Sequence, residues 1–179
     1  TPITQFEFQN QNNTIIATRL TVYQPLDIPG QIDVKGLKYL KIKDGLKKIK
    51  ISQFSHSNNL TDVHIGDCVK HIEAYSFSSC KSLRKVVIGN GVTSIGENAF
   101  NGCKNLDTVI LGDSVTFISD HAFAFCNILK IRLPRGIDYI GTSAFYGNKN
   151  LEEIHLSSIV PPEFGNYPFG ELYTHNPTF

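Results

Sequence analysis

Six phenylalanines recur along the chain at an almost constant interval. They are Phe54, Phe77, Phe100, Phe123, Phe145 and Phe169, separated by 23, 23, 23, 22 and 24 residues. A period in this range indicates a solenoid, in which each repeat is one coil and neighbouring coils bury a shared core. Because the repeated apolar positions serve packing, any function must lie where the repeats differ.

Each repeat contains two apolar stretches ahead of its phenylalanine. In residues 83–100 these are Leu83, Val86 and Ile88, and then Val92 and Ile95. The first stretch alternates and is rich in β-branched residues, which predicts a strand with one buried face. A Gly-Asp or Gly-Asn pair follows it in three coils and predicts a turn. The segment around Ala99-Phe100 has room only for a short helical or 3₁₀ turn. Stacked coils would then form a parallel sheet with strands about 4.8 Å apart.

Two repeats share a longer motif, LRKVVIGNGVTSIGENAFNGC over 83–103 and LDTVILGDSVTFISDHAFAFC over 106–126. The motif resembles the unit of the BspA-like, or Treponema-type, leucine-rich repeat family, and the resemblance covers residues 26 to about 170. It implies an α/β solenoid. In detail this is a β-rich, right-handed leucine-rich repeat superhelix with coils of about 23 residues, parallel strands and short helical or 3₁₀ turns. The chain departs from the family at Asn148, where cysteine is expected, and at Gln53, where alanine is expected.

We expect three parts in the chain. Residues 1–25 lack the repeat, and QFEF (5–8) and TIIATRLTVY (14–23) are typical of two strands in a hairpin that caps the first coil. Residues 26–160 would form the leucine-rich repeat solenoid. Residues 161–179 would form a C-terminal cap or a truncated last coil, because Pro161-Pro162 interrupts the second apolar stretch of that coil.

Charge and hydropathy argue against several classes of partner. The net charge is +1 and charged residues make up 18% of the chain, so we expect no nucleic-acid partner. No stretch approaches the roughly 18 apolar residues that could span a membrane. The chain begins at Thr1 and lacks methionine, so we expect that a leader has been removed. The family resemblance implies an exported bacterial protein, secreted or at the cell surface.

No catalytic or cofactor-binding motif is present. G-x-S-x-G, H-E-x-x-H, the P-loop and G-x-G-x-x-G are all absent, and the six histidines share no ligand spacing. We therefore expect no enzymatic activity, no cofactor and no metal site. Asp67, Asn90 and Asp113 occupy equivalent turns, where turn preference explains them better than a bound cation does.

Three of the four cysteines, Cys80, Cys103 and Cys126, share one repeat position. One interpretation is a column of inward, reduced thiols that act as small apolar residues. The other is disulfide formation, since stacking would bring neighbouring Cα atoms within range. We favour the reduced column.

Candidate binding residues lie where the main strands face outward. Between the last two apolar anchors of each strand the outward residues are, coil by coil, Lys41, His64, Val87, Ile110, Arg132 and His155. Val87 and Ile110 form an apolar centre flanked by His64 and Arg132, which suits protein recognition. The alternative is that valine and isoleucine only satisfy the β-propensity of a solvated strand.

A second candidate is an aromatic patch in two consecutive coils, made of Phe117, Phe125, Tyr139 and Tyr146. Aromatic side chains anchor protein interfaces and also stack on sugars. The alternative is that these four pack against the C-terminal segment, which contains Phe164, Tyr167, Phe169 and Tyr173.

These observations predict a non-enzymatic protein-binding module. The resemblance implies a secreted or surface-attached bacterial leucine-rich repeat protein that acts in adhesion or in host contact. Its partner would be a protein or an extracellular-matrix glycoprotein. The alternatives are a carbohydrate-binding accessory domain that uses the aromatic patch, and a structural spacer in a larger surface protein.

Overall fold

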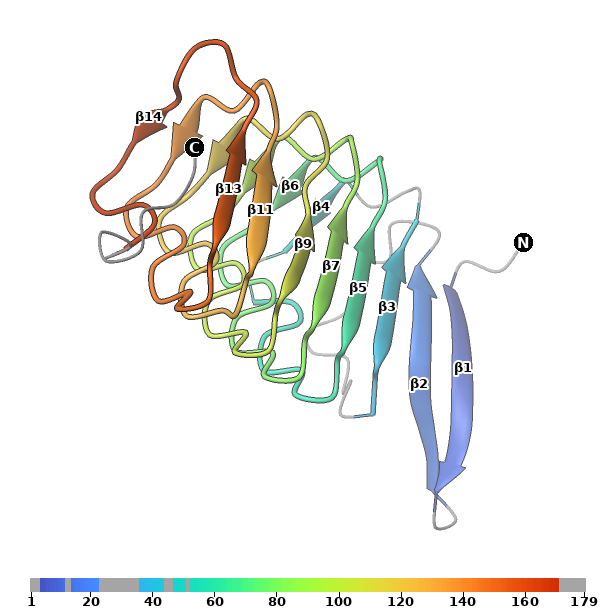
Figure 1. Ribbon diagram of the computed structural model, residues 1–179. Helices are drawn as coiled ribbons and strands as arrows, with labels where there is room; N and C mark the ends of the chain where they lie inside the picture. The colour runs from blue at the N-terminus through green and yellow to red at the C-terminus, as the bar shows by residue number, and fades with distance from the viewer. Residues whose placement is uncertain (1–3, 12–13, 23–35, 44–46, 51, 171–179) are drawn as a thin grey trace.

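The computed structural model describes residues 4–11, 14–22, 36–43, 47–50 and 52–170. Its coils stack along one axis as a right-handed solenoid, with an N-terminal hairpin at one end (Figure 1). The predicted solenoid architecture is therefore confirmed.

One sheet of the solenoid begins with the hairpin. β1 (Thr4–Gln11) pairs antiparallel with β2 (Thr14–Val22), and β2 pairs in parallel with the first strand of the coils. Four parallel strands follow: β3 (Tyr39–Ile42), β5 (Asp62–Ile65), β7 (Lys85–Ile88) and β9 (Thr108–Ile110). Pairing with β2 satisfies the edge that β3 would otherwise expose.

A second sheet lies across the core from the first (Figure 1). It consists of two-residue strands, one for each coil: β4 (Lys48–Ile49), β6 (His71–Ile72), β8 (Ser94–Ile95), β10 (Phe117–Ile118), β12 (Tyr139–Ile140) and β14 (Glu163–Phe164). A separate pair, β11 (Lys130–Leu133) and β13 (Glu153–Leu156), continues the side of the larger strands.

The recurring phenylalanines form a continuous column in the core. Neighbouring rings from Phe54 to Phe169 lie between 5.1 and 5.5 Å apart, and the rings of Phe100 and Phe123 are nearly parallel, at 1°. The side chains of Phe77, Phe100, Phe123 and Phe145 are fully buried. The repeat phasing is confirmed.

The expected helical or 3₁₀ turns are wrong, because the Ala-Phe segments form turns without a helix in the part of the chain that the structure describes. Alternate backbone N–H groups of these segments donate to carbonyl groups of the next coil. Phe77 donates to the carbonyl of Ala99 and Phe100 to that of Ala122, each at 2.8 Å. The residue two places before each of these phenylalanines has a positive φ, 57° at Tyr75 and 54° at Asn98. The left-handed backbone conformations, and the N–H groups that donate to the next coil, prevent the consecutive hydrogen bonds between residues three apart that a 3₁₀ helix needs.

The cysteine column is built from free, buried thiols. Each Sγ donates to the carbonyl of a phenylalanine in the preceding coil, with Sγ–O distances of 3.1–3.2 Å for Cys80, Cys103 and Cys126. The neighbouring Cys103 thiol and burial together raise the pKa of Cys80 well above its usual range. These thiols therefore serve as hydrogen-bond donors inside an apolar core.

Asn148 takes the place of the next cysteine and performs two tasks. Its Nδ2 donates to the carbonyl of Phe123 at 2.8 Å, as the thiols do in their coils. Its Oδ1 accepts the backbone N–H of Ile128 at 3.0 Å. In other coils the equivalent leucine N–H bonds within its own turn, as from Leu106 to the carbonyl of Cys103 at 2.9 Å. The coil of Ile128 is one residue shorter, so the asparagine supplies the acceptor that the shortened turn lacks.

Truncation of one phenylalanine should test the column. We expect Phe100→Ala to lower the unfolding free energy by about 3–5 kcal/mol, the usual cost of a large cavity in a core. Phe125→Ala is the matched control, because the Phe125 side chain is exposed. Its cost should stay below about 1 kcal/mol. Urea denaturation measures both, and equal costs would contradict the phasing.

The role of Asn148 can be tested by restoring cysteine. We expect Asn148→Cys to cost about 1–3 kcal/mol, because the buried N–H of Ile128 loses its acceptor. Inserting one lysine after Cys126 restores the regular coil length and should make the cysteine tolerable. The readout is a double-mutant cycle by urea denaturation. An identical cost with and without the insertion would show that the two departures are independent.

Candidate functional site

The outward column predicted on the main strands is present over four coils. Lys41, His64, Val87 and Ile110 are consecutive partners in the parallel register of β3, β5, β7 and β9. Their core-facing neighbours Val63 and Val86 are fully buried. The period-two alternation thus separates core from surface as expected.

The column does not continue as one ladder to Arg132, although the stacked coils were expected to form a single parallel sheet. Arg132 lies on β11 and pairs with His155 on β13, whereas β9 ends the sheet that begins with β1. The shortened coil explains the break. In regular coils the N–H of Arg84 bonds to the carbonyl of Thr61, at the same repeat position, while in the shortened coil Asn127 bonds to Leu106. The chain therefore approaches β11 along a shifted path.

The two residues of the apolar centre differ in exposure. Ile110 on β9 is exposed, at 49%, whereas Val87 on the paired strand β7 is less exposed and partly buried. Val109, which faces the core beside Ile110, retains 8% exposure, against 0% for Val86. β9 has no hydrogen-bonded strand partner on the side of β11, and Ile110 is the most accessible apolar side chain of this column.

His64 lies in a partly desolvated, positively charged setting. Its ring is 5.5 Å from that of Tyr39. Burial lowers the pKa of His64 below the ordinary 6.5, and the charges of Lys85 and Lys41 lower it further, against an opposing effect of Asp62. The imidazole is therefore neutral near pH 7.

The four aromatic residues of the predicted patch form two separate pairs. Phe117 and Tyr139 stack at 4.8 Å on β10 and β12, while Phe125 and Tyr146 meet edge to face at 5.4 Å in the turns after the core phenylalanines. Gly147, at φ +75°, makes room for the second pair, because a Cβ there would lie 2.7 Å from the Phe125 ring. Among the described residues no ring contact joins the two pairs.

Packing against the aromatic C-terminal segment is limited. Phe169 stacks on Phe145 and so extends the core column, and Phe164 meets Phe169 edge to face. Tyr167 is 67% exposed. Tyr173 lies outside the described residues. The segment thus extends the core column, and within the described residues its rings do not stack on the two aromatic pairs.

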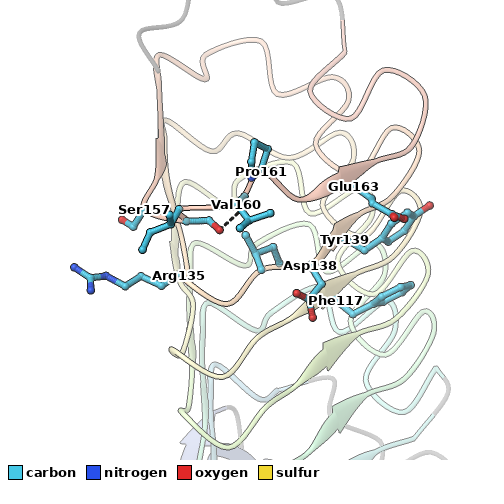
Figure 2. Close-up of a pocket in the computed structure, with 11 residues that line it drawn as sticks. Phe117, Arg135, Asp138, Tyr139, Ser157, Val160, Pro161 and Glu163 are labelled. Atoms are coloured by element: carbon cyan, nitrogen blue, oxygen red, sulfur yellow. Dashed lines mark hydrogen bonds between the residues drawn. The ribbon is translucent and has the colours of Figure 1, made fainter.

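An open groove of about 670 Å³ lies beside the first aromatic pair (Figure 2). Phe117 and Tyr139 line it together with Asp138, Glu163 and Arg135. The loop between β13 and β14 forms another wall, and it carries two strongly exposed aliphatic side chains, Ile159 at 98% and Val160 at 73%. Sequence reasoning missed them. The signal was the Ile-Val pair immediately before Pro161-Pro162, where the regular apolar stretch is displaced.

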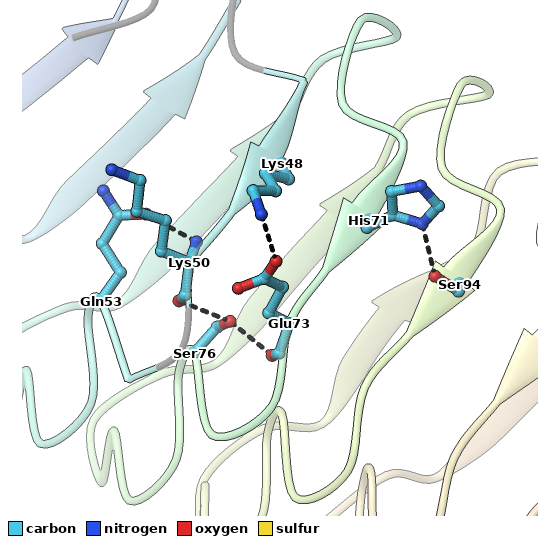
Figure 3. A network of polar contacts seen from close by, with 7 residues as sticks. All are labelled: Lys48, Lys50, Gln53, His71, Glu73, Ser76 and Ser94. Carbon is cyan, nitrogen blue, oxygen red and sulfur yellow. Dashed lines mark hydrogen bonds and ion pairs between the residues drawn. The ribbon is translucent and has the colours of Figure 1, made fainter. Parts of the chain in front are cut away.

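Polar side chains also meet across coils at the second sheet (Figure 3). Lys48 forms an ion pair with Glu73 at 2.8 Å, and His71 is hydrogen-bonded to Ser94 at 2.8 Å. In the turns, Asp67 Oδ1 accepts the N–H of Asn90, and Asn90 Oδ1 accepts that of Asp113. These contacts tie coil to coil, and within the described ranges no cluster of three His, Cys, Asp or Glu could hold a metal ion.

The repeat pattern matches a known family model. Six copies of the BspA type leucine rich repeat region match over residues 33–124 and 70–174. The chain belongs to this family. No curated protein matches it.

Solved structures share the fold of this BspA-type protein. A leucine-rich repeat protein of Treponema pallidum is 22% identical with a TM-score of 0.69, over 89% of this chain and 83% of that one. A leucine-rich cell surface protein of Faecalibacterium prausnitzii is 26% identical with a TM-score of 0.55, over 90% and 56%. A leucine-rich repeat protein of Bacteroides ovatus is 19% identical with a TM-score of 0.53, over 93% and 55%. The chain thus spans little more than half of the last two proteins.

The described part of the BspA-type chain contains no helix long and apolar enough to cross a membrane.

The electrostatic setting of His64 can be tested by nuclear magnetic resonance titration. We expect a midpoint below 6.5. Lys85→Gln should raise it, because a positive neighbour that disfavours the imidazolium is removed. Lys104→Gln, in an exposed turn, is the control and should leave the midpoint unchanged. The sign for stability follows. The unfolded chain protonates first as the pH falls through 6.5, so His64 lowers stability on acidification. A midpoint at or above 6.5 would contradict this setting.

Proposed function

We propose that this chain is a non-enzymatic protein-binding module of a secreted or surface-attached bacterial leucine-rich repeat protein, acting in adhesion or host contact. The observation that carries the proposal is the apolar pair Val87 and Ile110, in register on neighbouring strands and flanked by His64. An accessible aliphatic centre with a polar rim is typical of the interior of a protein interface. The likeness to a cell surface protein supports the location.

The domain organisation is part of the proposal. The hairpin within residues 1–25 would protect the first coil, residues 26–160 would carry the binding face, and residues 161–179 would close or continue the solenoid. Pairing of β2 with β3 supports the first part. The stacking of Phe169 on Phe145 supports the last.

Magnitudes show what the apolar centre can contribute. Fully burying the exposed parts of Val87 and Ile110 would yield about 1–3 kcal/mol together. Association itself costs at least about 4 kcal/mol in lost freedom of motion. The aliphatic pair can therefore centre an interface, but a partner must also engage the surrounding polar side chains, among them His64 and Arg132.

The test charges the centre of the face. Val87→Glu with Ile110→Lys should abolish capture of matrix or mucin proteins by the immobilised chain, because the apolar centre is replaced by two charged groups that a partner would have to desolvate. Asn58→Lys with Ser114→Glu introduces the same charges at exposed turn positions and should capture as the parent does. Thermal melting of both variants checks that they fold. Undiminished capture by the Val87/Ile110 variant would remove this face as the site.

A second candidate function is carbohydrate binding in the groove. The observation that favours it is the proximity of the Phe117–Tyr139 pair to the carboxylates of Asp138 and Glu163 (Figure 2). Aromatic rings stack on sugars, and carboxylates accept hydroxyl hydrogen bonds. The candidate predicts binding to neutral glycans that Tyr139→Ala weakens and Tyr146→Ala does not.

A further inference from the structure

The near-neutral charge of the whole chain hides a strong asymmetry along the solenoid. Residues 34–105 contain 12 lysines and arginines against five acidic residues, a net charge of +7. Residues 106–179 contain four against eight, a net charge of −4. The basic half includes the coils that carry Lys41, His64 and Val87.

Part of this charge lies on the face proposed for binding. Lys41 belongs to the outward column itself, and Lys85 stands beside it in register with Asp62. Lys38 and Arg84 are exposed at the points where the chain enters β3 and β7. In the described parts of the chain none of these four cations forms an ion pair.

The nearby carboxylates are engaged with hydroxyl groups. Thr61 donates to Asp62 and Thr108 donates to Asp107, each at 2.7 Å. The opposite arrangement holds beyond the sheet break, where Lys130 forms an ion pair with Glu153 across β11 and β13 at 2.5 Å. The two ends of the face therefore differ. In the last coils Lys130 is paired with a carboxylate, whereas in the first coils the four cations outnumber Asp62 and Asp107 and, within the described residues, form no ion pair.

We propose that the partner of this face presents an acidic polypeptide segment that lies over Lys41 and Lys85 and places aliphatic side chains on Val87 and Ile110. This proposal rests on the proposed function and specifies the chemistry of the partner. An excess of cations that form no ion pair favours an anionic ligand through charge complementarity. The adjoining aliphatic pair favours a polypeptide over a sulfated glycan, because a sulfated sugar offers no apolar side chain to cover it.

The field of these cations reaches the apolar centre. The charges of Lys85 and Lys41 both act on His64, which stands between Lys41 and Val87 in the register. A bound carboxylate would offset the positive potential of the two lysines. The same carboxylate would be drawn to the face before contact, since steering by charge raises association rates.

The experiment uses a fluorescent peptide of about ten residues, rich in glutamate and ending in two leucines, which is long enough to cross four strands. Fluorescence polarisation measures its binding to the full chain. We expect Lys41→Gln with Lys85→Gln to weaken binding roughly tenfold, and raising the salt to about 0.5 M to weaken the parent's binding to a similar extent. Lys104→Gln with Lys149→Gln removes the same charge from exposed turns and should stay within about twofold of the parent.

Three results would overturn the proposal. One is no detectable peptide binding by the parent, and another is equal weakening by the two lysine pairs. The third is binding of a heparin fragment, but not of the peptide, that depends on Lys41 and Lys85, because the ligand would then be a sulfated glycan. The peptide measurement does not use matrix proteins. Its failure is therefore distinguishable from a failure of the capture experiment, which tests the face itself.

Discussion

The fold depends on the contact between each core phenylalanine and the same residue one coil further on. Rings 5.1–5.5 Å apart fill the centre, and beside them the N–H of each phenylalanine from Phe54 to Phe145 donates to a carbonyl of the next coil at 2.7–2.8 Å. Ring stacking and the backbone hydrogen bond both require nearly the same distance between neighbouring coils, and that distance is close to the spacing of about 4.8 Å between strands in a sheet. Each coil depends on the next coil to accept its N–H hydrogen bonds and to cover one face of its phenylalanine ring, so a single coil would not be stable alone.

The same repetition explains which parts of the fold could be predicted. Positions that face the core recur in every coil, so Leu83, Val86 and Phe100 could be placed from sequence, and their burial is confirmed. The turns could not, because their geometry comes from positive φ at residues as different as Tyr75, Asn98 and Ser143. Asparagine favours a left-handed backbone, but tyrosine and serine give no such signal, so no side-chain type marks the position in every coil. Tertiary hydrogen bonds to the next coil select it instead.

The candidate site was predictable to the extent that it follows the strand period. His64, Val87 and Ile110 occupy the register expected of outward positions. The grouping of Phe125 and Tyr146 with Phe117 and Tyr139 was an expectation from adjacency in sequence, and the structure separates the pairs because they lie on different segments of the coil. Exposure also required the structure, since the break in strand pairing beside Ile110 was not expected.

The short coil connects stability to the surface. The coil that lacks one residue before Ile128 enters β11 along a shifted path, and the sheet that begins with β1 ends at β9. Asn148 limits the effect of the shortened turn on the core. Its side chain accepts the N–H of Ile128, which has no acceptor within the turn, and donates to the carbonyl of Phe123. The core column passes the break without interruption, at 5.4 Å between Phe123 and Phe145. The shortened coil therefore leaves the packing of the core column intact and changes the strand pairing at the surface, beside the exposed side chain of Ile110. The solenoid thus departs from its repeat at the position where a partner would find the most accessible aliphatic side chain of the column.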